Sequence, residues 1–67
     1  MTVKLNNIIF EDGTTLPCAL NLFIDDPAPG TIKSPSDFDH YVGDNAFAQL
    51  EHSFGTKAKS FKIESIS

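Results

Sequence analysis

Hydrophobic and polar residues alternate along two neighbouring stretches near the N-terminus, and this period of two predicts a β-hairpin over residues 3–24. The Asp12-Gly13 pair between the stretches is typical of a two-residue turn whose twist matches that of a hairpin. With that turn, opposite residues have numbers that add to 25. The face expected to form the core then pairs Val3 with Leu22, Leu5 with Leu20, Asn7 with Cys18, and Ile9 with Leu16.

The opposite face of the predicted hairpin is also apolar. Its side chains are Ile8, Phe10, Pro17, Ala19 and Phe23. A short chain does not easily cover both faces of a sheet, so we expect this second face to stay partly exposed and to be available to a partner. Asn7 is the polar exception on the core face; it lies near the rim of the sheet or marks a point where the register bends.

Pro17 indicates the position of the second strand in the sheet. In the predicted register the pair of Ile8 and Pro17 does not exchange hydrogen bonds, so the side of Pro17 that lacks an N–H faces away from the first strand. A further strand added there would lose a ladder hydrogen bond. The second strand is therefore predicted to be an edge.

A third strand is predicted over residues 60–66, where Phe61 and Ile63 alternate with Lys62 and Glu64. Pairing this strand antiparallel with the first strand gives the sheet order 2-1-3 and leaves Pro17 on a free edge. Placing it beside the second strand would create a parallel pair across Pro17. We favour the order 2-1-3.

The region 34–54 is predicted to be helical. Ser34 is suited to cap a helix that has Pro35 at its first position, and Gly55 is suited to end it. Two interpretations remain open: two short helices separated at Gly43, with Asp44 as a second cap, or one bent helix. The apolar spacing that suits one helix is Phe38, Val42, Ala46, Leu50 and Phe54.

These elements predict a small α+β domain of the order β-β-α-β, with an antiparallel three-stranded sheet and one or two short helices on one face. The whole chain, residues 1–67, is expected to form one domain: a hairpin (3–24), an acidic loop (25–33), a helical region (34–54) and a last strand (60–66). At 67 residues its core must be small.

Charge and composition narrow the function classes. The formal net charge is −4 and all five basic residues are lysines, which argues against direct binding to nucleic acid. No stretch is long and apolar enough for a membrane span or a secretory signal. A single cysteine forms no internal disulfide, so a cytoplasmic location is expected.

Possible reactive groups are few. Asp37, Asp39, His40 and His52 are metal-ligand types, but their spacing matches no known metal motif, and acids at a helix start are explained by the helix dipole. Cys18 is expected in the core, where a free thiol packs as a small apolar side chain rather than acting as a nucleophile. We predict no catalytic residue, no cofactor and no metal, and hence no enzyme.

The acids are concentrated in residues 25–51, whereas Lys57, Lys59 and Lys62 make the last part of the chain basic. The sequence therefore favours a protein-binding module that docks on the basic surface of a larger protein. A nucleic-acid-binding protein is one example of such a partner. Small size, acidity and the β-β-α-β order are similar in outline to phage-encoded inhibitors of host proteins. The alternative is a structural subunit that forms a homo-oligomer, such as a homodimer, or part of a larger assembly through the second-strand edge and the outer sheet face. The expected partner-binding residues are Asp25, Asp26, Asp37, Asp39, Asp44, Glu51, Ile8, Phe10 and Phe23.

Overall fold

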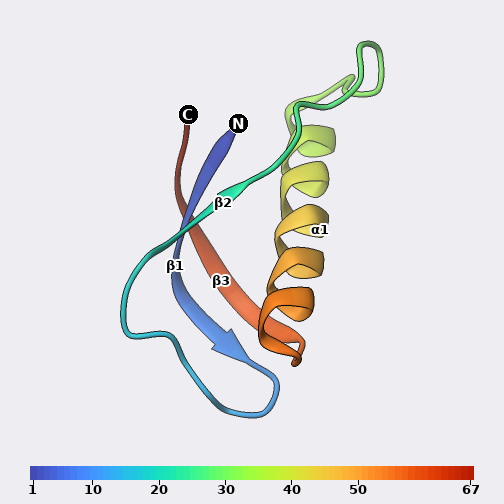
Figure 1. The fold of residues 1–67 in the computed structure, drawn as a ribbon. Helices are drawn as coiled ribbons and strands as arrows, with labels where there is room; N and C mark the ends of the chain where they lie inside the picture. Colours follow the sequence, from blue (N-terminus) through green and yellow to red (C-terminus); the bar gives the residue numbers. More distant parts are fainter.

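A computed structural model describes residues 1–67, with strands β1 (Thr2–Phe10) and β2 (Leu20–Phe23), helix α1 (Pro35–Phe54) and strand β3 (Ala58–Ile66). The strands form one antiparallel sheet in the order β2-β1-β3, and α1 runs along one face of it (Figure 1). The predicted α+β class, element order and strand order are confirmed. The two chain ends lie side by side, since Thr2 and Ser67 exchange backbone hydrogen bonds of 2.7 and 2.8 Å.

At its open end the hairpin has the predicted register. Val3 lies opposite Leu22 and Leu5 lies opposite Leu20, so the partner numbers add to 25. All four side chains are buried or packed against the core, as the alternation predicts.

Near its closed end the hairpin has a different register. The Phe10 N–H donates to the Thr14 carbonyl at 2.8 Å, and the Phe10 carbonyl accepts from the Gly13 N–H at 3.0 Å. The loop therefore has three residues and not two, with Gly13 in the left-handed region at φ 90°. The prediction of a two-residue turn was wrong, and Ile9 pairs with Thr15 instead of Leu16.

The two registers are joined by a segment that leaves the sheet. The Leu16 N–H still donates to the Ile8 carbonyl at 3.2 Å, but no strand is formed over residues 17–19. Three residues therefore separate Leu16 from Leu20, while two separate Leu5 from Ile8 on the facing strand. The predicted pair of Asn7 and Cys18 does not form, and Cys18 is exposed rather than buried.

Asn7 changes which side chains of the second half of β1 point into the core. Its φ of 52° is left-handed, and the pairing with β3 shifts by one residue between Asn6 and Ile9, which is a β-bulge. Beyond this bulge the inward positions become Ile8 and Phe10, exposed by only 1% and 2%. The placement of Ile8 and Phe10 on an outer apolar face was therefore wrong, because the prediction assumed an unbroken alternation along β1.

Strand β3 shows the predicted alternation. Phe61 and Ile63 are half-buried, whereas Lys62 and Glu64 are exposed. The strand carries two further register shifts, one between Lys4 and Leu5 of β1 and one between Ile9 and Phe10. In both shifts β3 has the extra residue, so its pairing with β1 is regular only in short stretches.

The helical region is one helix. The Ser34 hydroxyl accepts the Asp37 N–H at 3.2 Å, Pro35 is at the start of the helix, and Gly55 ends it at φ 72°. Gly43 lies within the helix and does not interrupt it. Of the two interpretations, a single helix is the one observed.

The core lies between α1 and the facing side of the sheet. Its ten buried residues are all hydrophobic, and no polar or charged residue is buried with them. They are Val3, Leu5, Ile8, Phe10, Leu22, Ile24, Val42, Ala46, Leu50 and Ala58. Two tilted aromatic pairs border this core: Phe10 with Phe54 at 5.2 Å and Phe47 with Phe61 at 4.6 Å between ring centroids.

Candidate interaction surface

Six acidic residues form what we call the acidic surface, and all of them are exposed. They are Asp25, Asp26, Asp37, Asp39, Asp44 and Glu51. The first two follow β2 and the other four belong to α1. The sequence-predicted acids are thus on the surface, as expected.

Three of these acids are seven residues apart along α1, and this spacing places Asp37, Asp44 and Glu51 on one side of the helix. The buried stripe of α1 consists of Val42, Ala46 and Leu50, which a rotation of about 100° per residue places on the opposite side. The negative charges therefore point away from the sheet. They are displayed along the length of the only helix.

Most carboxylates of the acidic surface have no partner within the chain. Asp26 lies 3.4 Å from the Met1 ammonium, and Asp37 accepts the Lys33 N–H at 3.1 Å at the start of α1. The side chains of Asp25, Asp39, Asp44 and Glu51 take part in no hydrogen bond or salt bridge. The fold thus leaves four of these negative charges free to interact with another molecule.

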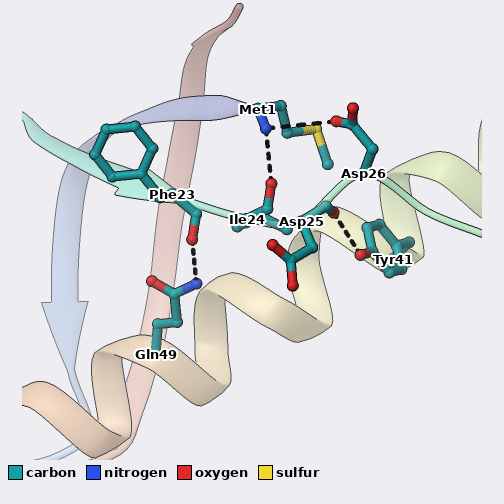
Figure 2. Close-up of polar contacts among 7 residues, drawn as sticks. All are labelled: Met1, Phe23, Ile24, Asp25, Asp26, Tyr41 and Gln49. Atoms are coloured by element: carbon teal, nitrogen blue, oxygen red, sulfur yellow. Dashed lines mark hydrogen bonds and ion pairs between the residues drawn. The ribbon is translucent and has the colours of Figure 1, made fainter.

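Two side chains of α1 fasten the end of β2 to the helix (Figure 2). Gln49 Nε2 donates to the Phe23 carbonyl at 2.7 Å, and the Tyr41 hydroxyl donates to the Asp25 carbonyl at 2.5 Å. Together they fix the backbone that carries Asp25 beside the helix that carries four of the six acids. Neither contact was predicted from the sequence, although Tyr41, Asn45 and Gln49 recur every four residues along one helix flank.

Phe23 is the only one of the three predicted aromatic or aliphatic contact residues that is available to a partner. Its side chain is 80% exposed, and Figure 2 shows its ring pointing away from α1. Ile8 and Phe10 are buried and cannot contact a partner without unfolding of the hairpin. The outer sheet face is thus mainly polar, with Phe23 and the 39% exposed Ile9 as its apolar residues.

The surface has one pocket, of about 480 Å³, next to the bulge in β1. Its lining is Asn7, Ile8, Ile9, Thr15 and Leu16. None of these side chains titrates near neutral pH or is a strong nucleophile. The pocket therefore holds no group suited to acid, base or covalent catalysis.

The possible reactive groups named from the sequence are not brought together. No group of three or more His, Cys, Asp or Glu side chains is placed so that it could hold a metal ion. His40 and His52 are exposed on α1, and Cys18 is exposed on the segment between the two registers of the hairpin.

The basic residues lie on β3 and just before it. Lys57, Lys59 and Lys62 are exposed, and the one side-chain ion pair of this region joins Lys4 Nζ to Glu64 Oε2 at 3.8 Å. The charge separation read from the sequence is therefore also a separation between elements, with negative charge on α1 and positive charge on β3.

Comparison with known proteins gives no functional assignment: no family model, curated protein or solved structure matches the chain. None of its helices has the length and apolar character needed to cross a membrane.

Proposed function

We propose that this protein is a non-enzymatic protein-binding module, an adaptor or inhibitor of the kind that phages use against host proteins. It docks on a larger protein that presents a basic surface, such as one that binds nucleic acid. The acidic surface makes the electrostatic contact, and Phe23 makes a separate apolar contact on the face of the sheet that points away from α1. The proposal includes a cytoplasmic location, since the single cysteine offers no disulfide for an oxidising compartment.

The observation that carries this proposal is the free state of the acids on α1. Asp39, Asp44 and Glu51 are exposed and have no partner within the chain, while the buried face of the same helix is fully apolar. Like charges on one element repel each other, so an acidic helix without internal cations is stabilised when a cationic surface approaches. Such a field also raises the rate of association.

Phe23 supports a second, short-range contact on the face of the sheet that points away from α1. An 80% exposed phenyl ring gains from burial only when a partner covers it, and aromatic residues of this kind are frequent anchors of protein interfaces. The hydrogen bond from Gln49 to the Phe23 carbonyl holds the backbone of this residue in place. The ring is therefore presented from a fixed position two residues before Asp25.

The test uses the intact chain as bait, with a matched pair of charge-reversal variants. Asp44→Lys changes the acidic surface, and Glu11→Lys makes the same charge change at the exposed hairpin turn. A specific partner should be captured by the wild type and by Glu11→Lys, and its capture should be weakened by Asp44→Lys. With that partner purified, Asp44→Lys should slow association and Phe23→Ala should speed dissociation.

The proposal is wrong if the captured partner binds all these variants with affinities within about twofold, which is below 0.5 kcal/mol. It is also wrong if Glu11→Lys and Asp44→Lys weaken binding equally. In that case only total charge would matter, and no particular surface would be used.

A further inference from the structure

The two edges of the sheet differ in how they are covered. On β2, the outward-facing Phe23 carbonyl is occupied by Gln49 of α1. On β3, which pairs with β1 alone, no hydrogen bond reaches the outer side of the strand. The nine-residue strand β3 is therefore the open edge, and not the second-strand edge that the sequence suggested for assembly.

The hydrogen-bonding direction along β3 follows from its pairing with β1. Thr2 and Ser67 exchange both backbone hydrogen bonds. In the first half of β1, the backbone N–H and carbonyl groups of even-numbered residues therefore point toward β3. Asn6 is one of these residues, so the backbone N–H and carbonyl of its partner Lys62 point toward β1. The neighbouring residue Ile63 must then direct its N–H and carbonyl to the open edge.

Ile63 is also the centre of a self-complementary charge pattern. It is preceded by Lys62 and followed by Glu64, which are both exposed. Lys62 is on the outer face opposite Asn6, and Glu64 is there too, because it contacts Lys4 at 3.8 Å. The two opposite charges thus flank Ile63 on the same face of the sheet.

We propose that β3 pairs antiparallel with β3 of a second copy of this chain, about a twofold axis at Ile63. Each Lys62 then lies opposite the partner subunit's Glu64, and each Glu64 lies opposite the partner subunit's Lys62. The two sheets become one sheet of six strands in the order β2-β1-β3-β3-β1-β2. This inference does not depend on the proposed function, because β3 carries none of the residues of the acidic surface.

Charge decides between the possible registers of such a pair. An axis at Lys62 would place the two Lys62 side chains opposite each other. It would also need hydrogen bonds from Lys62 backbone groups that already point toward β1. An axis at Phe61 would place Lys62 opposite Ser60 and leave no ion pair across the interface. The axis at Ile63 is the register that brings two pairs of opposite charges together.

A second observation on the same side of the molecule favours a second copy. Phe47 of α1 contacts Phe61 of β3 at 4.6 Å, yet it remains 40% exposed. Ile66 of β3 is 41% exposed. A sheet extended beyond β3 would place the second copy's helix on the same face, where it could cover these apolar side chains. The register shift at Glu64 limits the regular ladder, so side-chain pairs and apolar burial must supply much of the affinity.

The test is a charge swap measured by sedimentation equilibrium over a range up to about 1 mM chain. The wild type should reach twice the 7.3 kDa chain mass. Lys62→Glu and Glu64→Lys should each weaken the dimer by at least about tenfold, and the double variant Lys62→Glu with Glu64→Lys should recover it. Lys33→Glu makes the same charge change in the loop before α1 and should leave the dimer unaffected.

Hydrogen exchange identifies the edge independently of mass. The Ile63 amide should be protected in the wild type at high concentration and should lose this protection on dilution and in Lys62→Glu, while the Leu5 amide stays protected as a control for folding. The proposal is overturned if the wild type remains a monomer at about 1 mM, if the double variant fails to recover a dimer, or if Ile63 protection does not depend on concentration.

Discussion

Leu5 and Ile8 both point into the core, with 0% and 1% of their surface exposed, although Ile8 is the third residue after Leu5 in the same strand. A regular strand would place them on opposite faces. The left-handed Asn7 between them, at φ 52°, adds one residue to β1 and restores the inward facing for Ile8 and Phe10. The position of this bulge therefore determines which apolar residues of the hairpin are buried.

Variants of Asn7 should report this backbone requirement. Asn7→Val places a β-branched residue at a positive φ and should lower the free energy of unfolding by about 1–3 kcal/mol. Asn7→Gly should leave it within about 0.5 kcal/mol or raise it, since glycine adopts this conformation freely. Urea unfolding followed by circular dichroism measures both. Equal losses in the two variants would show that the Asn7 side chain, and not its backbone, is what matters.

The sequence was informative wherever one local signal was sufficient. The alternation fixed the pairs of Val3 with Leu22 and Leu5 with Leu20, and the capping residues Ser34 and Gly55 marked both ends of α1. It failed between Asn7 and Ala19, because the bulge at Asn7 belongs to the pairing of β1 with β3, a strand distant in the sequence, and the alternation alone does not register an added residue. An asparagine among apolar residues was the one local sign of the bulge.

The candidate surface was predictable to a similar degree. Acids in loops and on a helix stay solvated in almost any fold, so their exposure followed from composition. Which aromatic residues reach the surface depends on strand facing, and one shift of register exchanged the expected roles of Ile8 and Phe10. Phe23 has its predicted position because it belongs to the open end of the hairpin, where the predicted register is the one observed.

Phe10 and Phe23 should respond differently to truncation. Phe10 is 2% exposed and packs against Phe54, so Phe10→Ala should cost about 3–5 kcal/mol, a large part of the stability of so short a chain. Phe23→Ala removes an 80% exposed ring and should change stability by less than about 0.5 kcal/mol. Thermal melts of the two variants provide the comparison. A strongly destabilised Phe23→Ala would mean that its ring is covered in the folded protein.

The exposed position of Cys18 gives a chemical test of the irregular segment. The thiol should react with a disulfide reagent in the native state at nearly the rate seen in denaturant, because residues 17–19 do not pack into the sheet. Ala46→Cys in a Cys18→Ser background supplies the buried control, since Ala46 is 0% exposed. That control should react only on unfolding. Slow native labelling of Cys18 would contradict its exposed position and support the regular register, in which Cys18 lies opposite Asn7.

The two glycines of the α1 region should respond to alanine in opposite directions. Gly43 lies within the helix and nothing approaches the site of an added Cβ, so Gly43→Ala should stabilise the protein by about 0.5–1 kcal/mol. Gly55 ends the helix at φ 72°, where a Cβ is strained, so Gly55→Ala should destabilise it by about 1 kcal/mol. Chemical denaturation measures both. Stabilisation by Gly55→Ala would contradict the left-handed cap.

Asp12 gives the hairpin turn a dependence on pH. The Thr14 hydroxyl donates to its carboxylate at 2.6 Å and the Thr14 N–H donates at 2.9 Å, and these bonds lower the pKa of Asp12 below its ordinary value of 3.8. A folded-state pKa below the unfolded value means that the stabilisation is present above pH 3.8 and is lost as the pH falls through the lowered pKa.

The hydroxyl is the larger of the two contributions, so Thr14→Ala should move the pKa of Asp12 back toward 3.8, as followed by NMR titration of its carboxyl carbon. Asp12→Asn removes the titrating group. It should therefore lose less stability than the wild type between about pH 5 and pH 2, measured by urea unfolding. Glu11→Gln removes a neighbouring charge but keeps the hydrogen bonds between Asp12 and Thr14, and it should retain the acid sensitivity of the wild type at this turn. An unchanged pKa of Asp12 in Thr14→Ala would show that the hydroxyl does not bond to the carboxylate in solution.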